Sequence, residues 1–62
     1  MSAAHSEVVL VLRTSVGCLR LAVALLQEQT DDAERAETLD VIERQAGEAE
    51  AAAAALAVLG GE

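Results

Sequence analysis

Few side chains in this 62-residue sequence could take part in chemistry. His5 is the only histidine, so its imidazole is the only side chain that could carry a phosphoryl group on nitrogen or titrate near neutral pH. Cys18 is the only cysteine, which rules out an intrachain disulfide and leaves zinc binding dependent on ligands from elsewhere. We interpret His5 as a solvent-facing or seam-end histidine and Cys18 as a small buried apolar residue. Phosphotransfer through His5 and redox chemistry or an intermolecular disulfide at Cys18 remain alternatives.

Carboxylates are the other reactive groups. The sequence has eleven acidic residues, four arginines and no lysine, which gives a formal net charge of −7. Helical di-iron sites need a Glu-x-x-His pair, and the sequence contains none. We therefore predict a solvated acidic face, with no catalytic residue, no metal and no cofactor. The negative charge also disfavours nucleic acid as a partner, as it does an anionic membrane surface.

The apolar stretch at residues 8–26 approaches the roughly 20 residues that a membrane span needs. Arg13 and Arg20 interrupt it, and with Ser6 and Gln27 they form a polar row at seven-residue spacing. Such a row is typical of an amphipathic helix that is buried on one side. Residues 1–7 lack the lysine or arginine of a signal peptide. We expect no membrane partner and a cytoplasmic protein.

The sequence contains one segment of turn-forming residues between two predicted helices. Residues 29–32 are the only central break, where Asp31 followed by Glu34 predicts a helix N-cap with a capping box. Ser2 is a suitable first N-cap, and Gly60 with Gly61 predicts the end of the second helix. No strand pattern is present. We predict one all-α domain over residues 1–62, an antiparallel helical hairpin with helices at about 3–28 and 32–59 and a turn at about 29–31.

Both predicted helices carry apolar residues at alternating steps of three and four, the heptad pattern of a left-handed bundle. In the first helix the main row is Val9, Leu12, Val16, Leu19, Val23 and Leu26. A second row beside it is Val8, Val11, Ser15, Cys18, Ala22 and Leu25. In the second helix the row is Leu39, Ile42, Ala46, Ala49, Ala53 and Leu56. We expect Gly47 to mark a close helix contact or a bend, and Arg13 and Arg20 to pair with acids of the second helix.

Oligomerisation is the remaining way to stabilise so short a chain, because it has neither a disulfide nor a metal site. Two adjacent apolar rows are also wider than one partner helix covers, and soluble monomers avoid exposed apolar strips. We therefore predict that two hairpins form a four-helix bundle, a homodimer or a pair with a close relative. The predicted dimer interface is Val9, Leu12, Val16, Cys18, Leu19, Val23, Leu26, Leu39, Ile42, Ala46, Ala49, Ala53 and Leu56.

One stretch of the first helix resembles a known family. Leu12, Arg13 and Thr14 match part of the His-Glu-Leu-Arg-(Thr/Asn)-Pro-Leu motif in the dimerisation and phosphoacceptor (DHp) domain of bacterial sensor histidine kinases. The Ile-Arg-x-Ala-x-x-Leu-Leu run that follows this motif is matched without a gap by Leu19, Arg20, Ala22, Leu25 and Leu26. Residues 31–32 and 41–45 are similar to the turn and second helix of that domain.

The resemblance implies a degenerate copy. The family's phosphoacceptor histidine falls on Leu10, its neighbouring acid on Val11 and its proline on Ser15, and we expect no ATP-binding domain. It implies a non-catalytic dimerisation or docking module whose partner is a histidine kinase or a response regulator, contacted through Leu10, Arg13 and Thr14. Two other functions stay open: a docking domain of a multienzyme assembly line, and a histidine phosphotransfer protein that uses His5.

Overall fold

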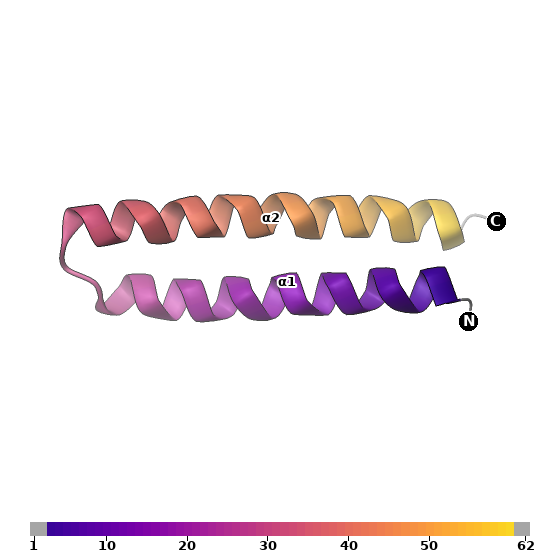
Figure 1. Cartoon of the computed structure of the whole chain (residues 1–62), viewed down its shortest axis with the longest axis horizontal. Coiled ribbons are helices and arrows are strands. Elements are labelled where there is room, and N and C mark those ends of the chain that lie inside the picture. The colour runs from indigo at the N-terminus through magenta and orange to yellow at the C-terminus, as the bar shows by residue number, and fades with distance from the viewer. Residues whose placement is uncertain (1–2, 61–62) are drawn as a thin grey trace.

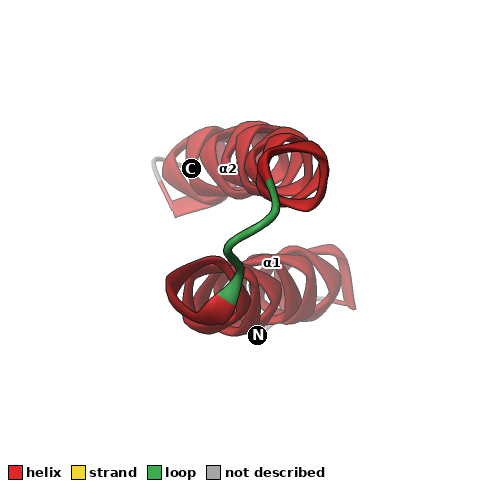
Figure 2. Cartoon of the chain, turned by 90° about the vertical axis from the view of Figure 1, so that its left-hand side faces the viewer, coloured by secondary structure: helices red, strands yellow, loops and turns green. Residues whose placement is uncertain are grey.

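The protein is an antiparallel hairpin of two long helices, seen in a computed structural model that describes residues 3–60. Helix α1 (Ala3–Glu28) and helix α2 (Asp32–Gly60) lie side by side, and α1 begins at the same end of the rod as α2 ends (Figure 1). The view along the helices shows them crossing at a shallow angle (Figure 2). The molecule measures 47 × 14 × 12 Å. The predicted all-α hairpin is confirmed.

Helix α2 begins with the N-cap that the sequence predicts. The backbone N–H of Glu34 donates to Asp31 Oδ2 at 3.0 Å, and the Arg35 N–H donates to the Asp31 carbonyl at 3.0 Å. Within residues 3–60 the reciprocal bond, from the Asp31 N–H to the Glu34 carboxylate, does not form, so only one half of the capping box is present. Asp32 and Glu34 place negative charge in the first turn, where the helix dipole favours it.

Arg35 ties the start of α2 to the end of α1. Its Nη1 donates to the carbonyls of Leu26 at 2.8 Å and Gln29 at 3.0 Å. Carbonyls in the last turn of a helix lack intrahelical partners, and a guanidinium can supply several donors in one plane. Beside it, the Thr38 hydroxyl donates to Gln29 Oε1 at 2.7 Å and lies 3.1 Å from the Glu34 carbonyl. The turn is therefore fixed by side chains of α2.

The remaining predicted helix ends differ or lie outside the described residues. Gly60 is the last residue of α2 and does not have a positive φ, so it is helical and does not form a left-handed cap. Ser2 and Gly61 fall outside the described residues.

A row of side chains on each helix fills the contact between them, and we call this contact the hairpin seam. Every member is buried or half-buried. On α1 the members are His5, Val8, Leu12, Ser15, Leu19, Ala22 and Leu26, and Gln29 of the turn continues the row. On α2 they are Arg35, Thr38, Ile42, Gln45, Ala49, Ala52, Leu56 and Leu59. Both rows alternate steps of three and four, as in a coiled coil.

Only half of the main apolar row that the sequence predicts for α1 lies between the two helices. Leu12, Leu19 and Leu26 do pack in the hairpin seam, but Val16 and Val23 are 44% and 43% exposed. The seam uses Ser15 and Ala22 in their place, and Val8 in place of Val9, which is half-buried beside it. On α2, likewise, Thr38, Gln45 and Ala52 replace the predicted Leu39, Ala46 and Ala53. On α1 the small Ser15 and Ala22 side chains let the helices approach, which leaves the larger Val16 and Val23 outside. On α2 the buried Thr38 hydroxyl keeps its hydrogen bonds, and the larger Leu39 is left outside.

The core that results is thin. Ala22 and Ala52 are the only apolar residues in the described part of the chain that count as buried, and Ser15, at 1% exposure, is more enclosed than either. The accessible surface is 4585 Å², whereas a compact monomer of 6.4 kDa exposes about 3,800 Å². The excess, roughly 800 Å² per copy, is close to what each partner buries in a standard protein interface. One hairpin leaves that much surface uncovered.

Gly47 neither bends α2 nor makes a close contact, which corrects the expectation from sequence. It is exposed inside the helix, and a Cβ added there would meet nothing within 4 Å. We predict that Gly47→Ala stabilises the protein by roughly 1 kcal/mol, because alanine loses less backbone freedom in a helix. Urea unfolding followed by circular dichroism measures this. An unchanged or lower midpoint would show that Gly47 has a contact outside the single chain.

Candidate interaction surface

One flank of the hairpin seam is apolar on both helices. Val9, Val16 and Val23 each follow a seam residue by one position on α1, as Leu39, Ala46 and Ala53 do on α2. Each step turns the helix by about 100°. Because the helices run in opposite directions, the same step leads to the same side of the hairpin. We call these six residues the valine face.

The valine face is accessible in the single chain. Leu39 is 51% exposed, Val16 44% and Val23 43%, Ala53 is also exposed, and Val9 and Ala46 are half-buried. The six residues are all among those that the sequence predicts for the dimer interface. The other predicted interface residues divide into the hairpin seam (Leu12, Leu19, Leu26, Ile42, Ala49 and Leu56) and Cys18, which is half-buried on the opposite flank.

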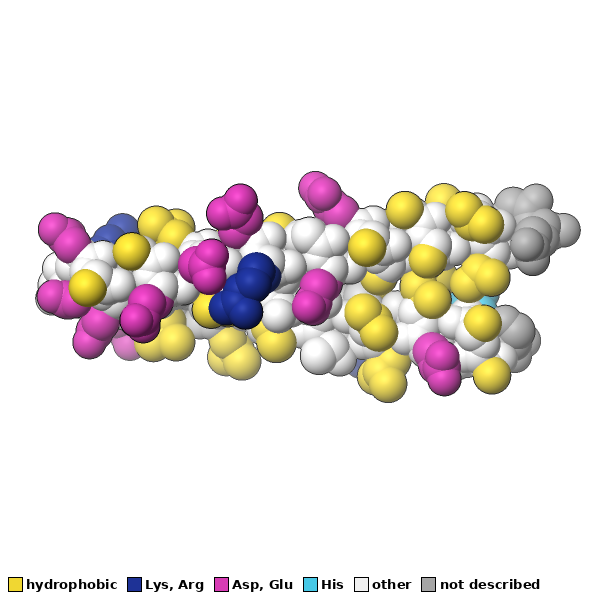
Figure 3. All heavy atoms as spheres, turned by 45° about the horizontal axis from the view of Figure 1, so that its top comes forward, with side chains coloured by type: hydrophobic (Ala, Val, Ile, Leu, Met, Phe, Trp, Pro, Cys, Tyr) yellow, Lys and Arg dark blue, Asp and Glu magenta, His cyan; other side chains and the backbone are white. Residues whose placement is uncertain are grey.

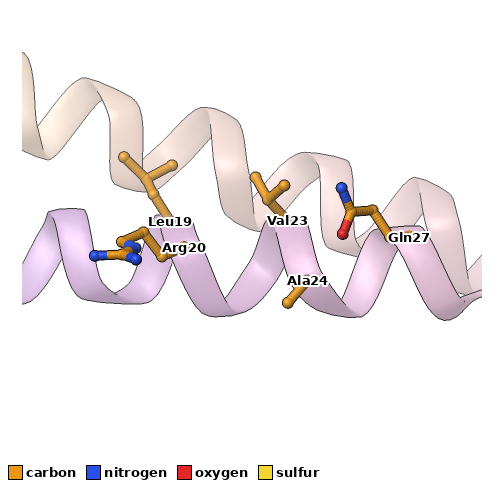
Figure 4. Close-up of a pocket in the computed structure, with 5 residues that line it drawn as sticks. All are labelled: Leu19, Arg20, Val23, Ala24 and Gln27. Atoms are coloured by element: carbon orange, nitrogen blue, oxygen red, sulfur yellow. The ribbon is translucent and has the colours of Figure 1, made fainter.

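Shallow grooves run along the α1 edge of the valine face. One is lined by Leu19, Arg20, Val23, Ala24 and Gln27, and in Figure 4 Leu19 and Val23 point toward α2 while Ala24 points away. A second is lined by Leu12, Arg13, Val16, Gly17 and Arg20, and a third by Ser6, Val9, Leu10 and Arg13. All three are lined by α1 residues alone. This edge of α1 therefore has hollows between successive turns into which side chains of another helix could fit.

Charged residues border the valine face on both sides. Arg13 and Arg20 follow the valine row by four positions on α1, and Glu43 and Glu50 follow Leu39 and Ala46 by four positions on α2. Residues four apart are neighbours on a helix surface, turned by about a further 40°. One rim of the face is therefore basic and the other acidic.

These four charged side chains are exposed, and none makes an ion pair within residues 3–60. The predicted pairing of Arg13 and Arg20 with acids of α2 is therefore wrong. The ion pair that does form in this part of the chain joins Arg44 and Asp40 on α2 at 3.4 Å, with both side chains 68% exposed. The geometry explains the difference, because Arg13 and Arg20 point away from α2 while the acids of α2 point away from α1.

The opposite flank of the seam is less uniform. Val11 and Leu25 are exposed there and Cys18 is half-buried, but in the facing row of α2 Glu34 and Glu48 alternate with the half-buried Val41 and Ala55. Figure 3 shows one side of the molecule, on which acidic side chains lie mostly toward the turn and hydrophobic ones gather where the termini lie. The valine face is the longer uninterrupted apolar surface.

The other predicted site residues are spread along α1. Leu10 is 65% exposed, and Arg13 and Thr14 are exposed close to it, so these three predicted partner contacts share an accessible region. His5 is half-buried in the first turn, on the hairpin seam. Within residues 3–60 no three potential metal ligands come together.

Helix α1 is also long and apolar enough to cross a membrane, judged by length and composition only, with a mean hydropathy of 2.0 over its most apolar window. The same properties are found in core helices of soluble proteins and in signal sequences. The chain matches no family model, no curated protein and no solved structure.

Proposed function

We propose that the protein is a non-catalytic interaction module that joins two polypeptides by pairing with a second copy of itself in a four-helix bundle. The valine face carries this proposal: it is an apolar surface on both helices that the hairpin itself covers only in part. Helices in such bundles commonly bury three positions of each heptad. The hairpin seam uses two of them, and the valine face is the third.

The size of the uncovered surface supports the proposal. Burial of apolar surface contributes about 25 cal/mol per Å². The hairpin seam is small, with alanine, serine and threonine at its most buried positions. A second copy would add leucine and valine burial that the single chain lacks, so folding and association should be coupled.

The test is capture of one copy by another. We expect an affinity-tagged copy to retain an untagged copy, at a mass of twice 6.4 kDa by light scattering. The two species are mixed after separate purification, which requires exchange of subunits. Retention of no untagged copy at any concentration, with a mass of one chain, would contradict the proposal.

A second role, docking to a histidine kinase or a response regulator, is favoured by one observation. Leu10, Arg13 and Thr14 lie together and are exposed, and Leu10 points away from both the hairpin seam and the valine face. A homodimer would leave Leu10 accessible. We propose that this region contacts the kinase or regulator, as the resemblance of α1 to the DHp domain implies.

Binding measurements with kinases and regulators encoded near this protein test the docking role. Leu10→Asp should weaken binding at least tenfold while leaving the dimer intact, since loss of one buried leucine costs about 1.5–3 kcal/mol. An unchanged affinity for every such partner would sink the docking role. Attachment of the hairpin to large biosynthetic enzymes would favour assembly-line docking, and acid-labile phosphate on His5 would favour phosphotransfer.

A further inference from the structure

The order of residues across the valine face restricts how a second copy can pack on it. From one edge to the other lie a basic row (Arg13, Arg20), the valines of α1, the apolar row of α2 and an acidic row (Glu43, Glu50). Two identical faces can meet about a two-fold axis that runs either along the helices or across them. The two arrangements bring different rims together.

With the axis along the helices, α1 of each copy lies on α2 of the other, and the basic rim of one copy meets the acidic rim of the other. With the axis across the helices, α1 lies on α1, so that arginines face arginines and glutamates face glutamates. Like charges placed side by side oppose association, whereas opposite charges favour it. The charges therefore select the first arrangement.

The positions of these charged residues along the helix axis agree with this choice. Arg20 lies eight residues before the end of α1, and Glu43 lies eleven residues after the start of α2. Arg13 and Glu50 lie 15 and 18 residues from the same ends. Each difference of three residues corresponds to about 4.5 Å along the helix, which arginine and glutamate side chains can bridge. A two-fold axis along the helices leaves the position of each residue along the rod unchanged, so the arginines of one copy lie near the glutamates of the second copy.

We infer that two copies associate through the valine face with α1 of each on α2 of the other, so that Arg13 and Arg20 of one copy pair with Glu50 and Glu43 of the second copy. The inference rests on the proposed dimerisation and names its orientation. It also gives a role to four charges that make no ion pair inside residues 3–60. Cys18 lies outside this contact, on the opposite flank.

Charge reversal with complementation tests the orientation. The variants R13E/R20E and E43R/E50R should each dimerise roughly ten- to hundredfold more weakly than the wild type, because four contacts per dimer become repulsive. An equimolar mixture of the two should form a heterodimer, and the chain with all four substitutions should form a homodimer again. Added salt should reduce these differences. Light scattering and sedimentation measure each species.

The control is E37R/E48R, which changes the net charge from −7 to −3 just as E43R/E50R does, but lies on the other side of α2. It should dimerise like the wild type. If the wild type dimerises while the mixture shows no heterodimer, or if both rim variants dimerise normally, the orientation is wrong and dimerisation stands. If the wild type is a monomer, dimerisation itself fails and the orientation with it.

Discussion

The double variant V16D/V23D should abolish dimerisation. Val16 and Val23 are 44% and 43% exposed in the single chain, so a second copy can bury less than half of each side chain. At about 1.5 kcal/mol or more for burying a whole valine, the four valines of a dimer lose about 3 kcal/mol of burial. That corresponds to roughly a 100-fold weaker dissociation constant, and the cost of burying carboxylates without a partner weakens the dimer further. Because the hairpin seam is thin, the helix content should fall as well. Sedimentation and circular dichroism at matched concentration measure both effects.

Leu21→Asp is the matched control for this variant. Leu21 is 71% exposed on α1 and lies away from the valine face, so the charge it introduces meets water in both monomer and dimer. The dissociation constant of the Leu21→Asp dimer should be close to that of the wild-type dimer. If V16D/V23D dimerises like the control, the valine face is not the contact between copies, whatever else the hairpin binds.

Removing the Arg35 side chain should have the second-largest effect, on the stability of the hairpin. Arg35→Ala deletes two charge-assisted hydrogen bonds to the carbonyls of Leu26 and Gln29. Each such bond contributes about 1.5–3 kcal/mol when its partner is left without another donor. We expect a loss of about 2 kcal/mol, because water can replace part of the interaction at this half-buried site. Urea unfolding at a concentration where the wild type is associated measures it.

Arg44→Ala is the control, since it removes an arginine from the same helix. The Arg44–Asp40 pair is exposed, and surface pairs of this kind contribute about 0–1 kcal/mol. The unfolding midpoint should fall clearly for Arg35→Ala and barely for Arg44→Ala. Equal effects would mean that the turn is not fixed by Arg35 and that the loss of a positive charge alone explains the change.

The division into two helices was predictable because turn chemistry is local. Asp31 caps α2 through a backbone N–H only three residues away, and residues 29–31 are the one central break in two long periodic segments. The role of Arg35 was not predictable from these signals. Its partners, Leu26 and Gln29, lie on the other side of the turn, so the bonds depend on how the two helices approach each other.

The assignment of rows to surfaces needed the structure. In the α1 sequence, Leu12 and Leu19 continue equally well with the valines or with Ser15 and Ala22, because both choices keep steps of three and four. Hydrophobicity alone selected the valines. The helices instead pack through the smaller residues, of which Ser15 is 1% exposed and Ala22 6%. That choice leaves the valines for the outer face, where the candidate interface lies.

The sequence therefore predicted which residues belong to the candidate site, but not on which side of the hairpin they lie. All six members of the valine face were expected at the dimer interface, whereas Arg13 and Arg20 were expected to pair with acids of the second helix. Their separation follows from helix geometry, since Arg13 and Glu50 point to opposite edges of one face. The resemblance of α1 to the DHp domain stays a prediction, as does the nature of any further partner.

The coupling of helix formation to association is the central claim, and a dilution series tests it most directly. Molar mass and helix content are measured on the same samples, with and without lipid vesicles. We predict that the mass falls from twice 6.4 kDa toward 6.4 kDa and that helix content falls with it, whether or not vesicles are present. A monomer that keeps its full helix content at every concentration would contradict the account, and so would helix content that depends on vesicles alone.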